Sequence, residues 1–264
     1  MFRNILLAGI LILSCFFASG CATAPYTGRS QLIFMNTAEE KRLGQQASSK
    51  IQSEEKLERG TKRAQMVERA GKRIAAVADR PDFDWEFHTI QKDEVNAFCL
   101  PGGKVFVYTG ILQIMGDNEA ELAAVMGHEI AHAIARHGAE SSSVGTLAGI
   151  GQFGVALAEA LFTQGGSSLS DASGAALNLG VVLPHSRTQE EEADYIGLML
   201  MAKAGYNPEA AISFWQKMAA ANTGKEPLFF LSTHPLNQER INNIRKDLPK
   251  ARVYYEQSGR ARAD

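Results

Sequence analysis

Residues 128–132 of the chain read HEIAH, and the stretch around them has the periodicity of a helix from Glu119 to about Arg136. Asp117 or Asn118 can cap this helix at its start, and Gly138 is its expected stop. Residues four apart on a helix lie on the same face, one turn apart. The two histidines of the motif can therefore bind one metal ion, and the fold is expected to be built around this helix.

The motif holds the residue types that a catalytic zinc site uses. His128 and His132 offer ring nitrogens to Zn²⁺, and Glu129 can point its carboxylate at a water on the metal. Zinc lowers the pKa of such a water, and Glu129 takes its proton as the water attacks a carbonyl. Ala124 and Ala131 share the histidine face, so another element can come close to the metal. The plain alternative is two solvated histidines on a surface helix.

A third ligand is expected, because catalytic zinc takes three protein ligands and keeps one position open. Glutamates occupy all of 190–192, at the start of a helix predicted over 187–204, and they point three ways. Only the face of Glu190 continues through small or acidic residues, among them Asp194 and Gly197. We therefore predict Glu190 as the ligand, and Asp194 as the acceptor of a hydrogen bond from a ligand histidine. A solvated acidic helix start is the alternative.

The remaining segments predict an α+β fold that is mainly helical with a small sheet. The other expected helices cover 37–59 and 62–78, and further ones begin after Asn207-Pro208 and after Pro235. Two stretches have the composition and alternation of strands, 85–90 and 105–108. Residues 144–162 predict a buried or flexible helix rather than a membrane span, and 164–185 a mobile loop.

Four segments occur together in the order that a known family shows. They are 96–103 (NAFCLPGG), 128–132 (HEIAH), Ser186-Arg187 with Glu190 and Asp194, and Thr233-His234-Pro235 with Arg240-Ile241. In these segments the chain resembles the HtpX-type and CaaX-prenyl-protease-type zinc metallopeptidases, in their soluble bacterial lipoprotein branch. The resemblance covers most of residues 36–250.

The resemblance implies a zincin-like domain whose active-site helix carries the 128–132 motif. The implied zinc ligands are His128, His132 and Glu190. Glu129 is the implied catalytic base. An edge strand near 105–108 is also implied, and it would pair with an extended substrate.

Other polar residues of these segments have more than one possible role. In the family motif His234 lies near the active site, where it can stabilise an oxyanion, occupy the open zinc position in a resting state, or only pack at a helix start. Arg240 can bind substrate, carry transition-state charge, or form an ion pair. His137 and His185 are expected to be peripheral.

The start of the chain has the features of a secreted lipoprotein. Residues 1–20 read as a signal peptide, with an apolar run too short for a comfortable membrane span. Its end, three small residues before Cys21, resembles a bacterial lipobox, so Cys21 is the expected lipidation site; ordinary cleavage nearby is the alternative. With Ala22 next, the resemblance implies the outer membrane. Residues 21–36 are then a lipidated N-terminus and tether, and 37–264 the zinc metallopeptidase domain.

Composition excludes several classes of protein. The 264 residues carry 27 Lys plus Arg against 29 Asp plus Glu, a net charge of −2. That lack of basic surplus argues against nucleic acid as a partner. Hydrophobic residues at 45 % and charged residues at 21 % exclude a disordered chain. Once the signal peptide is removed and Cys21 is lipidated, Cys99 is a lone cysteine, expected to be buried filler.

The predicted function is a zinc-dependent endopeptidase, with one Zn²⁺ per chain and polypeptides as substrates. The resemblance adds that these are unfolded or misassembled envelope proteins, cleaved at the periplasmic face of the bacterial outer membrane, to which the lipid anchors the enzyme. The first alternative is a periplasmic chaperone or assembly factor with a mainly latent zinc site. The second is a metal-sensing or storage module. Glu129 favours the enzyme, since neither alternative needs a base.

Overall fold

The computed structural model describes residues 21–146, 185–224 and 227–259. Its elements are β1 (Cys21–Thr23), β2 (Ser30–Leu32), α2 (Thr37–Glu54), β3 (Leu57–Glu58), α3 (Lys62–Ala75), β4 (Glu86–Ile90), β5 (Ala97–Leu100), β6 (Lys104–Tyr108), α4 (Thr109–Met115), α5 (Glu119–Ile134), α7 (Arg187–Lys203), α8 (Ala210–Ala221), α9 (Phe229–Thr233) and α10 (Gln238–Gln257). The α+β, mainly helical fold is thus confirmed. The predicted signal peptide, and the predictions for 147–184, lie outside the described residues.

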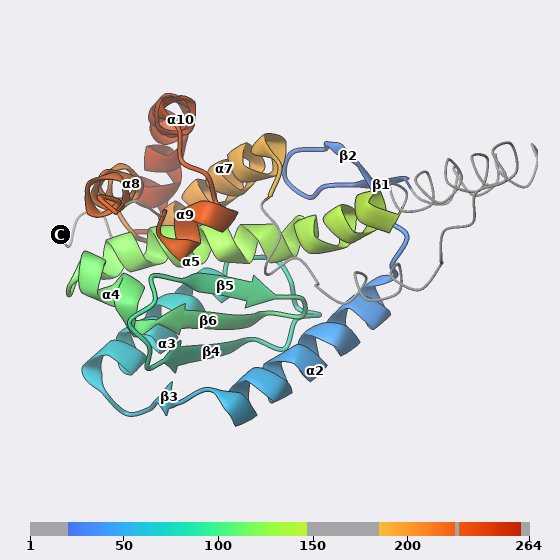
Figure 1. Ribbon diagram of the computed structural model, residues 1–264. Helices are drawn as coiled ribbons and strands as arrows, with labels where there is room; N and C mark the ends of the chain where they lie inside the picture. The colour runs from blue at the N-terminus through green and yellow to red at the C-terminus, as the bar shows by residue number, and fades with distance from the viewer. Residues whose placement is uncertain (1–20, 147–184, 225–226, 260–264) are drawn as a thin grey trace, which may run out of the picture.

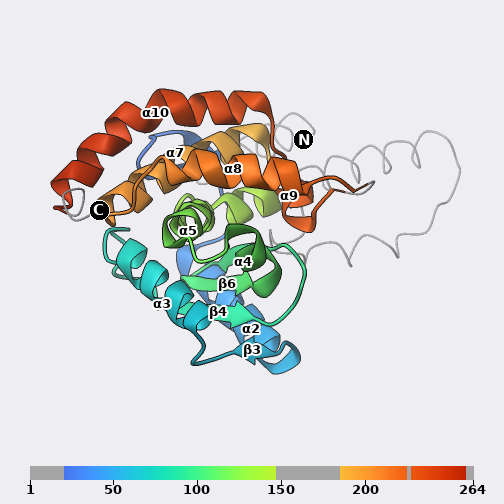
Figure 2. The same ribbon diagram turned by 90° about the vertical axis from the view of Figure 1, so that its left-hand side faces the viewer.

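Helix α5 lies at the centre of the molecule, between the sheet and the C-terminal helices (Figure 1, Figure 2). The sheet has the order β3-β4-β6-β5, in which β4 and β6 are parallel and the other pairs antiparallel. Helix α2 packs on one face of the sheet, while α3 and α5 pack on the other. Helices α7 and α8 cover the far side of α5. Every residue of α5 from Glu121 to Ile134 is buried.

The end of α5 differs from its expected stop at Gly138. The side chain of Asn118 caps the helix start, as expected. The helix ends at Ile134, because Arg136 has a positive φ of 59°, and helical residues resume over 137–146. Two contacts hold Arg136 there: its Nε donates to Glu40 Oε2 at 2.7 Å, and its second guanidinium nitrogen to the Met35 carbonyl at 2.7 Å. The break turns the next residues back toward α5.

The prediction that the strand near 105–108 lies at the edge of the sheet is wrong. That segment is β6, and it is paired on both sides, by β4 and by β5. Among the described residues, the strand paired on one side only at this end of the sheet is β5, from Ala97 to Leu100. A tight turn joins it to β6, with positive φ at Gly102 and Gly103. The edge that faces α5 is therefore β5.

Residues 21–36, expected to be a tether, are packed against the domain. Strands β1 and β2 form an antiparallel hairpin. The amide of Gln31 donates to the Ala135 carbonyl at 2.7 Å, and the hydroxyl of Tyr26 to the Ala78 carbonyl at 3.1 Å. This hairpin therefore lies against the end of the motif helix.

The first long helix is shorter than expected. The sequence predicts a helix over 37–59, but α2 ends at Glu54, because Leu57 and Glu58 pair with β4 as the short strand β3. Among the helices of the described ranges, none combines the length and the apolar character that crossing a membrane requires.

Candidate metal centre

Helices α5 and α7 approach each other backbone to backbone. A Cβ atom on Gly197 would lie 2.7 Å from the backbone nitrogen of His128, and one on Gly127 would lie 2.8 Å from the carbonyl of Gly197. Neither position can therefore carry a side chain without moving a helix. This close crossing brings the Glu190 face of α7 onto the histidine face of α5, the arrangement that the helical spacing predicts.

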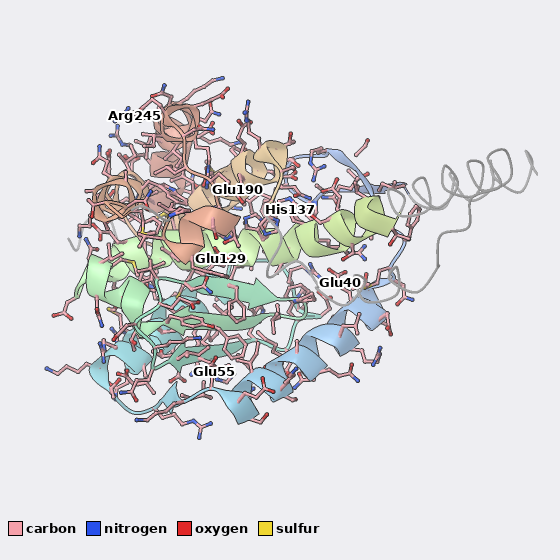
Figure 3. All side chains as sticks on the ribbon, viewed as in Figure 1. Glu40, Glu55, Glu129, His137, Glu190 and Arg245 are labelled. Atoms are coloured by element: carbon pink, nitrogen blue, oxygen red, sulfur yellow. The ribbon has the colours of Figure 1, made fainter. Side chains whose placement is uncertain are left out.

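Four buried side chains converge at this crossing. They are His128, His132, Glu190 and His234, and one ligand atom from each lies within 4.8 Å of all the others. The Nε2 atoms of His128 and His132 are 3.1 Å apart, and His234 Nδ1 lies 3.0 Å from Glu190 Oε1. Figure 3 shows Glu190 on α7 above Glu129 on α5. Three imidazoles and one carboxylate are a donor set that suits zinc.

Glu129 lies beside these donors without being one of them. Its Oε1 is buried, has no hydrogen-bond partner among the described residues, and lies 3.6 Å from His234 Nε2. Burial raises the pKa of Glu129. A buried carboxylate oxygen that lacks a hydrogen bond costs free energy of folding. A water bound at the metal would supply that hydrogen bond.

The charges of the donors favour a cation. Burial alone would raise the pKa of Glu190, but His128, His132 and His234 hold it well below its usual value. Burial lowers the pKa of His132 well below its usual value, which keeps the ring neutral, as a metal ligand must be. Burial also opposes charge on His128, but Asp194 and Glu190 raise its pKa to about 9. A histidine binds a metal only as the neutral ring, so His128 would have to be deprotonated in the metal-bound site.

Asp194 and Arg240 contact two of the donors, His128 and Glu190. Asp194 Oδ1 lies 3.0 Å from His128 Nδ1, as the helical face predicts for the partner of a ligand histidine. Arg240 donates to both oxygens of Asp194, at 2.7 and 2.9 Å, and a further guanidinium nitrogen lies 2.7 Å from Glu190 Oε2. The side chain of Arg240 is 0 % exposed. The substrate-binding role considered for Arg240 does not fit this burial, and the ion-pair role does.

Two histidines expected to be peripheral lie at the site. His137 is 0 % exposed, and its Nδ1 is 2.8 Å from His132 Nδ1. The ring of His185 stacks on that of His132 with centroids 4.0 Å apart. Glu192, expected to lead away from the metal, is buried against His137 Nε2 at 2.9 Å. Helical spacing could not reveal His137, because the break at Arg136 decides where it points.

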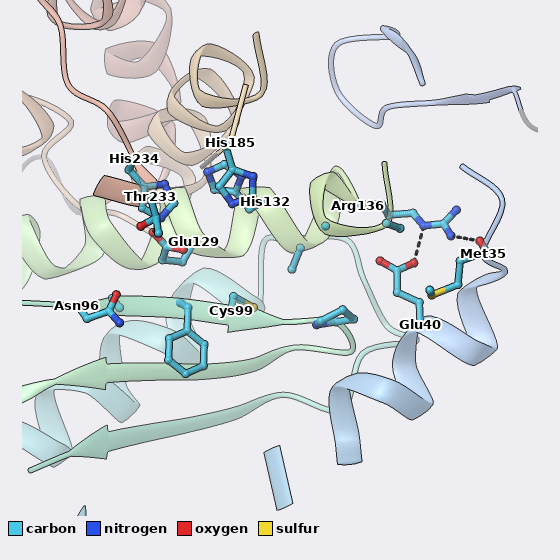
Figure 4. Close-up of a pocket in the computed structure, with 16 residues that line it drawn as sticks. Met35, Glu40, Asn96, Cys99, Glu129, His132, Arg136, His185, Thr233 and His234 are labelled. Carbon is cyan, nitrogen blue, oxygen red and sulfur yellow. Dashed lines mark hydrogen bonds and ion pairs between the residues drawn. The ribbon is translucent and has the colours of Figure 1, made fainter. Parts of the chain in front are cut away.

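A pocket separates the edge strand β5 from α5 (Figure 4). Asn96, Cys99 and neighbouring residues line it from the strand side, and Glu129 and His132 line it from the helix side. The ion pair between Arg136 and Glu40 lies at its far end (Figure 4). Cys99, expected to be buried filler, is half-buried and lines the pocket, and burial raises the pKa of its thiol well above the usual value. The catalytic candidates and a free strand edge thus share one cavity.

Comparison with known proteins agrees with this geometry. Residues 61–248 match the model of peptidase family M48. The chain is 42 % identical to "Mitochondrial metalloendopeptidase OMA1" of Schizosaccharomyces pombe, over 89 % of this chain and 68 % of that protein. It is 32 % identical to "Metalloendopeptidase OMA1, mitochondrial" of Bos taurus, over 91 % and 48 %. It is 28 % identical to "Beta-barrel assembly-enhancing protease" of Escherichia coli (strain K12), over 92 % and 50 %.

The chain therefore spans 68 % of the first of these relatives and about half of the other two. Their names support the wider peptidase family. They do not single out the HtpX-type and CaaX-prenyl-protease-type branch that the motifs resemble.

Proposed function

The chain belongs to peptidase family M48 and is a metalloendopeptidase, and from that premise we propose that it hydrolyses unfolded or misassembled polypeptides with one Zn²⁺ held by His128, His132 and Glu190. The observation that carries the proposal is the buried cluster of these three residues with His234, beside Glu129, whose Oε1 has no hydrogen-bond partner among the described residues. Zinc supplies Lewis acidity there and makes a water acidic enough to act as nucleophile near neutral pH.

Glu129 does the proton chemistry in this proposal. It accepts the proton of the attacking water and passes it to the departing amine. Burial raises its pKa, which makes the carboxylate a better base than an exposed glutamate. Its place at the wall of the pocket, opposite β5, puts it next to a polypeptide lying along that strand.

His234 has two roles in the proposal. Its Nδ1 lies 3.3 Å from His128 Nε2, among the other donors. As the fourth donor, His234 would close the metal site in the resting state. A catalytic zinc needs an open position, so His234 withdraws when substrate enters. Its Nε2 already faces Glu129, 3.6 Å away, where a displaced imidazole can donate a hydrogen bond to the developing oxyanion.

Strand β5 supports unfolded chains as substrates. A strand edge recognises an extended peptide through main-chain hydrogen bonds, which a folded protein cannot offer without local opening. One relative is named for β-barrel assembly, which agrees with envelope proteins as substrates, whereas others are named as mitochondrial. We base the choice of envelope proteins on the predicted signal peptide and lipobox.

Unfolded casein distinguishes the peptidase from the chaperone alternative. The zinc-loaded protein should convert casein into peptides that mass spectrometry identifies, because the edge strand needs only extended chain and the site needs only a peptide carbonyl. A tightly folded control substrate should remain intact. If the protein delays aggregation of an unfolded client but releases no peptide, the chaperone function replaces the peptidase.

We also propose that the protein is an outer-membrane lipoprotein facing the periplasm, with lipid on Cys21. Cells fed labelled palmitate should incorporate label into the wild type and into Cys99→Ser, whose cysteine lies in the folded domain. Cys21→Ser should incorporate none, and the wild type should fractionate with the outer membrane. Recovery of unlabelled wild type in the soluble periplasm would reject the anchor and leave the catalytic proposal intact.

A further inference from the structure

The two histidines of the motif have different partners behind them. For each, the Nε2 atom faces the other donors, and the Nδ1 atom faces away. His128 Nδ1 meets the carboxylate of Asp194. His132 Nδ1 instead meets another imidazole, that of His137, at 2.8 Å. The proposed metal ligand His132 is therefore oriented by a residue that the peptidase mechanism does not use.

His137 is linked through Glu192 to residues near the start of the chain. Its Nε2 lies 2.9 Å from Glu192 Oε2, and the same oxygen accepts from Arg29 Nε at 2.7 Å. The hydroxyl of Thr27 donates to the other oxygen of Glu192. Both Arg29 and Thr27 belong to the turn of the β1–β2 hairpin. A continuous line of polar contacts thus joins that hairpin to His132.

Arg29 is fixed in place by a second carboxylate. Its two terminal nitrogens donate to Glu140 at 2.7 and 2.8 Å, a two-point contact that sets the plane of the guanidinium. Glu140 also accepts from the amide of Gln189 at 2.8 Å. The arginine therefore bridges two carboxylates from different segments, Glu140 near the end of the motif helix and Glu192 on α7.

The direction of the hydrogen bonds is consistent from one end to the other. If His132 binds a metal through Nε2, its Nδ1 carries the hydrogen and donates to His137 Nδ1. His137 then carries its hydrogen on Nε2 and donates to Glu192, which stays charged beside Arg29. The buried line holds no unpaired donor or acceptor. With His137 held in this tautomer by Glu192, a His132 ring that carried its hydrogen on Nε2 would leave no hydrogen between the two Nδ1 atoms.

A shorter series of contacts, without the second imidazole, lies behind the first histidine. Behind His128 stand Asp194 and then Arg240 from α10, and behind His132 stand His137, Glu192 and then Arg29 from the hairpin. Each line ends on an arginine whose charge holds a buried carboxylate. We propose that His137 is a positioning residue for His132, and that the β1–β2 hairpin holds it in place through Arg29 and Glu192. The inference rests on the proposed metal site and assigns a role in it to residues before Thr37.

Co²⁺ binding to the full protein tests this role directly, since bound Co²⁺ reports its ligand geometry by visible absorption. His137→Phe keeps a ring of similar size but removes the acceptor, and it should weaken Co²⁺ binding about 10–100-fold and alter the spectrum. Arg29→Ala should give a smaller loss of the same kind. Because Arg29 acts through His137, the double variant should bind no more weakly than His137→Phe alone.

The matched control is His88→Phe. His88 also contacts a glutamate, Glu86 at 2.9 Å, but it stacks on Phe106 at the α2 face of the sheet. The His88→Phe variant should bind Co²⁺ as the wild type does. If His137→Phe does not fold, Glu192→Gln takes its place, because it keeps the shape of Glu192 and removes the charge; it too should weaken binding.

Three results would overturn the inference. Wild-type affinity and spectrum in folded His137→Phe or Glu192→Gln would show that His132 needs no such support. Losses that add in the double variant would show that Arg29 does not act through His137. A wild type that binds no Co²⁺ would remove the metal site itself, and with it the proposed function.

Discussion

Glu129→Gln should retain its metal and lose cleavage by about 10²–10⁴-fold or more, the range that general-base catalysis contributes. The amide has nearly the shape of the carboxylate but cannot accept the proton of the attacking water. Glu129 is not among the four donors, so the zinc content should stay at that of the wild type. The measurement is kcat/KM on unfolded casein, with zinc determined on the same samples.

A second glutamate of the same helix provides the control. Glu121 is as buried as Glu129, but its carboxylate contacts Ser213 and Lys217, both on α8, rather than the pocket. Glu121→Gln should therefore cleave casein at close to the wild-type rate. Full activity in Glu129→Gln would mean that another group is the base, and the mechanism proposed here would be wrong.

Glu190→Ala should lose the metal altogether, and cleavage with it. The substitution removes the only carboxylate among the four donors and leaves Arg240 with one carboxylate fewer to neutralise it inside the protein. The three imidazoles that remain, with no negative donor among them, should hold zinc too weakly to survive dialysis against a chelator. Zinc per chain, measured after such dialysis, should fall from about one in the wild type to near zero.

Glu191→Ala is the matched control, since Glu191 is half-buried one position further along α7 and is not one of the four donors. It should keep its zinc. Glu192→Ala should weaken zinc binding through His137, although Glu192 is not one of the four donors. Full zinc in Glu190→Ala, or loss confined to Glu191→Ala, would place the third ligand on a different face of the helix.

Helical spacing is sufficient to predict which side chains share a face when they lie on one regular helix. The positions of His128, His132, Glu190 and Asp194 relative to their own axes depend only on 3.6 residues per turn. The small residues on those faces, above all Gly197, also indicated that the helices could approach closely. The structure brings these side chains together as the spacing predicts.

Contacts between distant segments explain the predictions that failed. His137 turns back to His132 only because Glu40 and Met35 hold Arg136 at a positive φ, and both lie about a hundred positions earlier in the chain. Which strand forms the sheet edge depends on the parallel pairing of β4 with β6, which neither strand shows in its own sequence. The composition of residues 21–36 indicates a tether, but their packing against the motif helix makes them a hairpin.

The most direct measurement is zinc content and casein cleavage on the same preparations of wild type, Glu129→Gln and Glu190→Ala. We expect one zinc with cleavage in the wild type, one zinc without cleavage in Glu129→Gln, and neither zinc nor cleavage in Glu190→Ala. Cleavage by zinc-free protein, or undiminished cleavage by zinc-loaded Glu129→Gln, would contradict it.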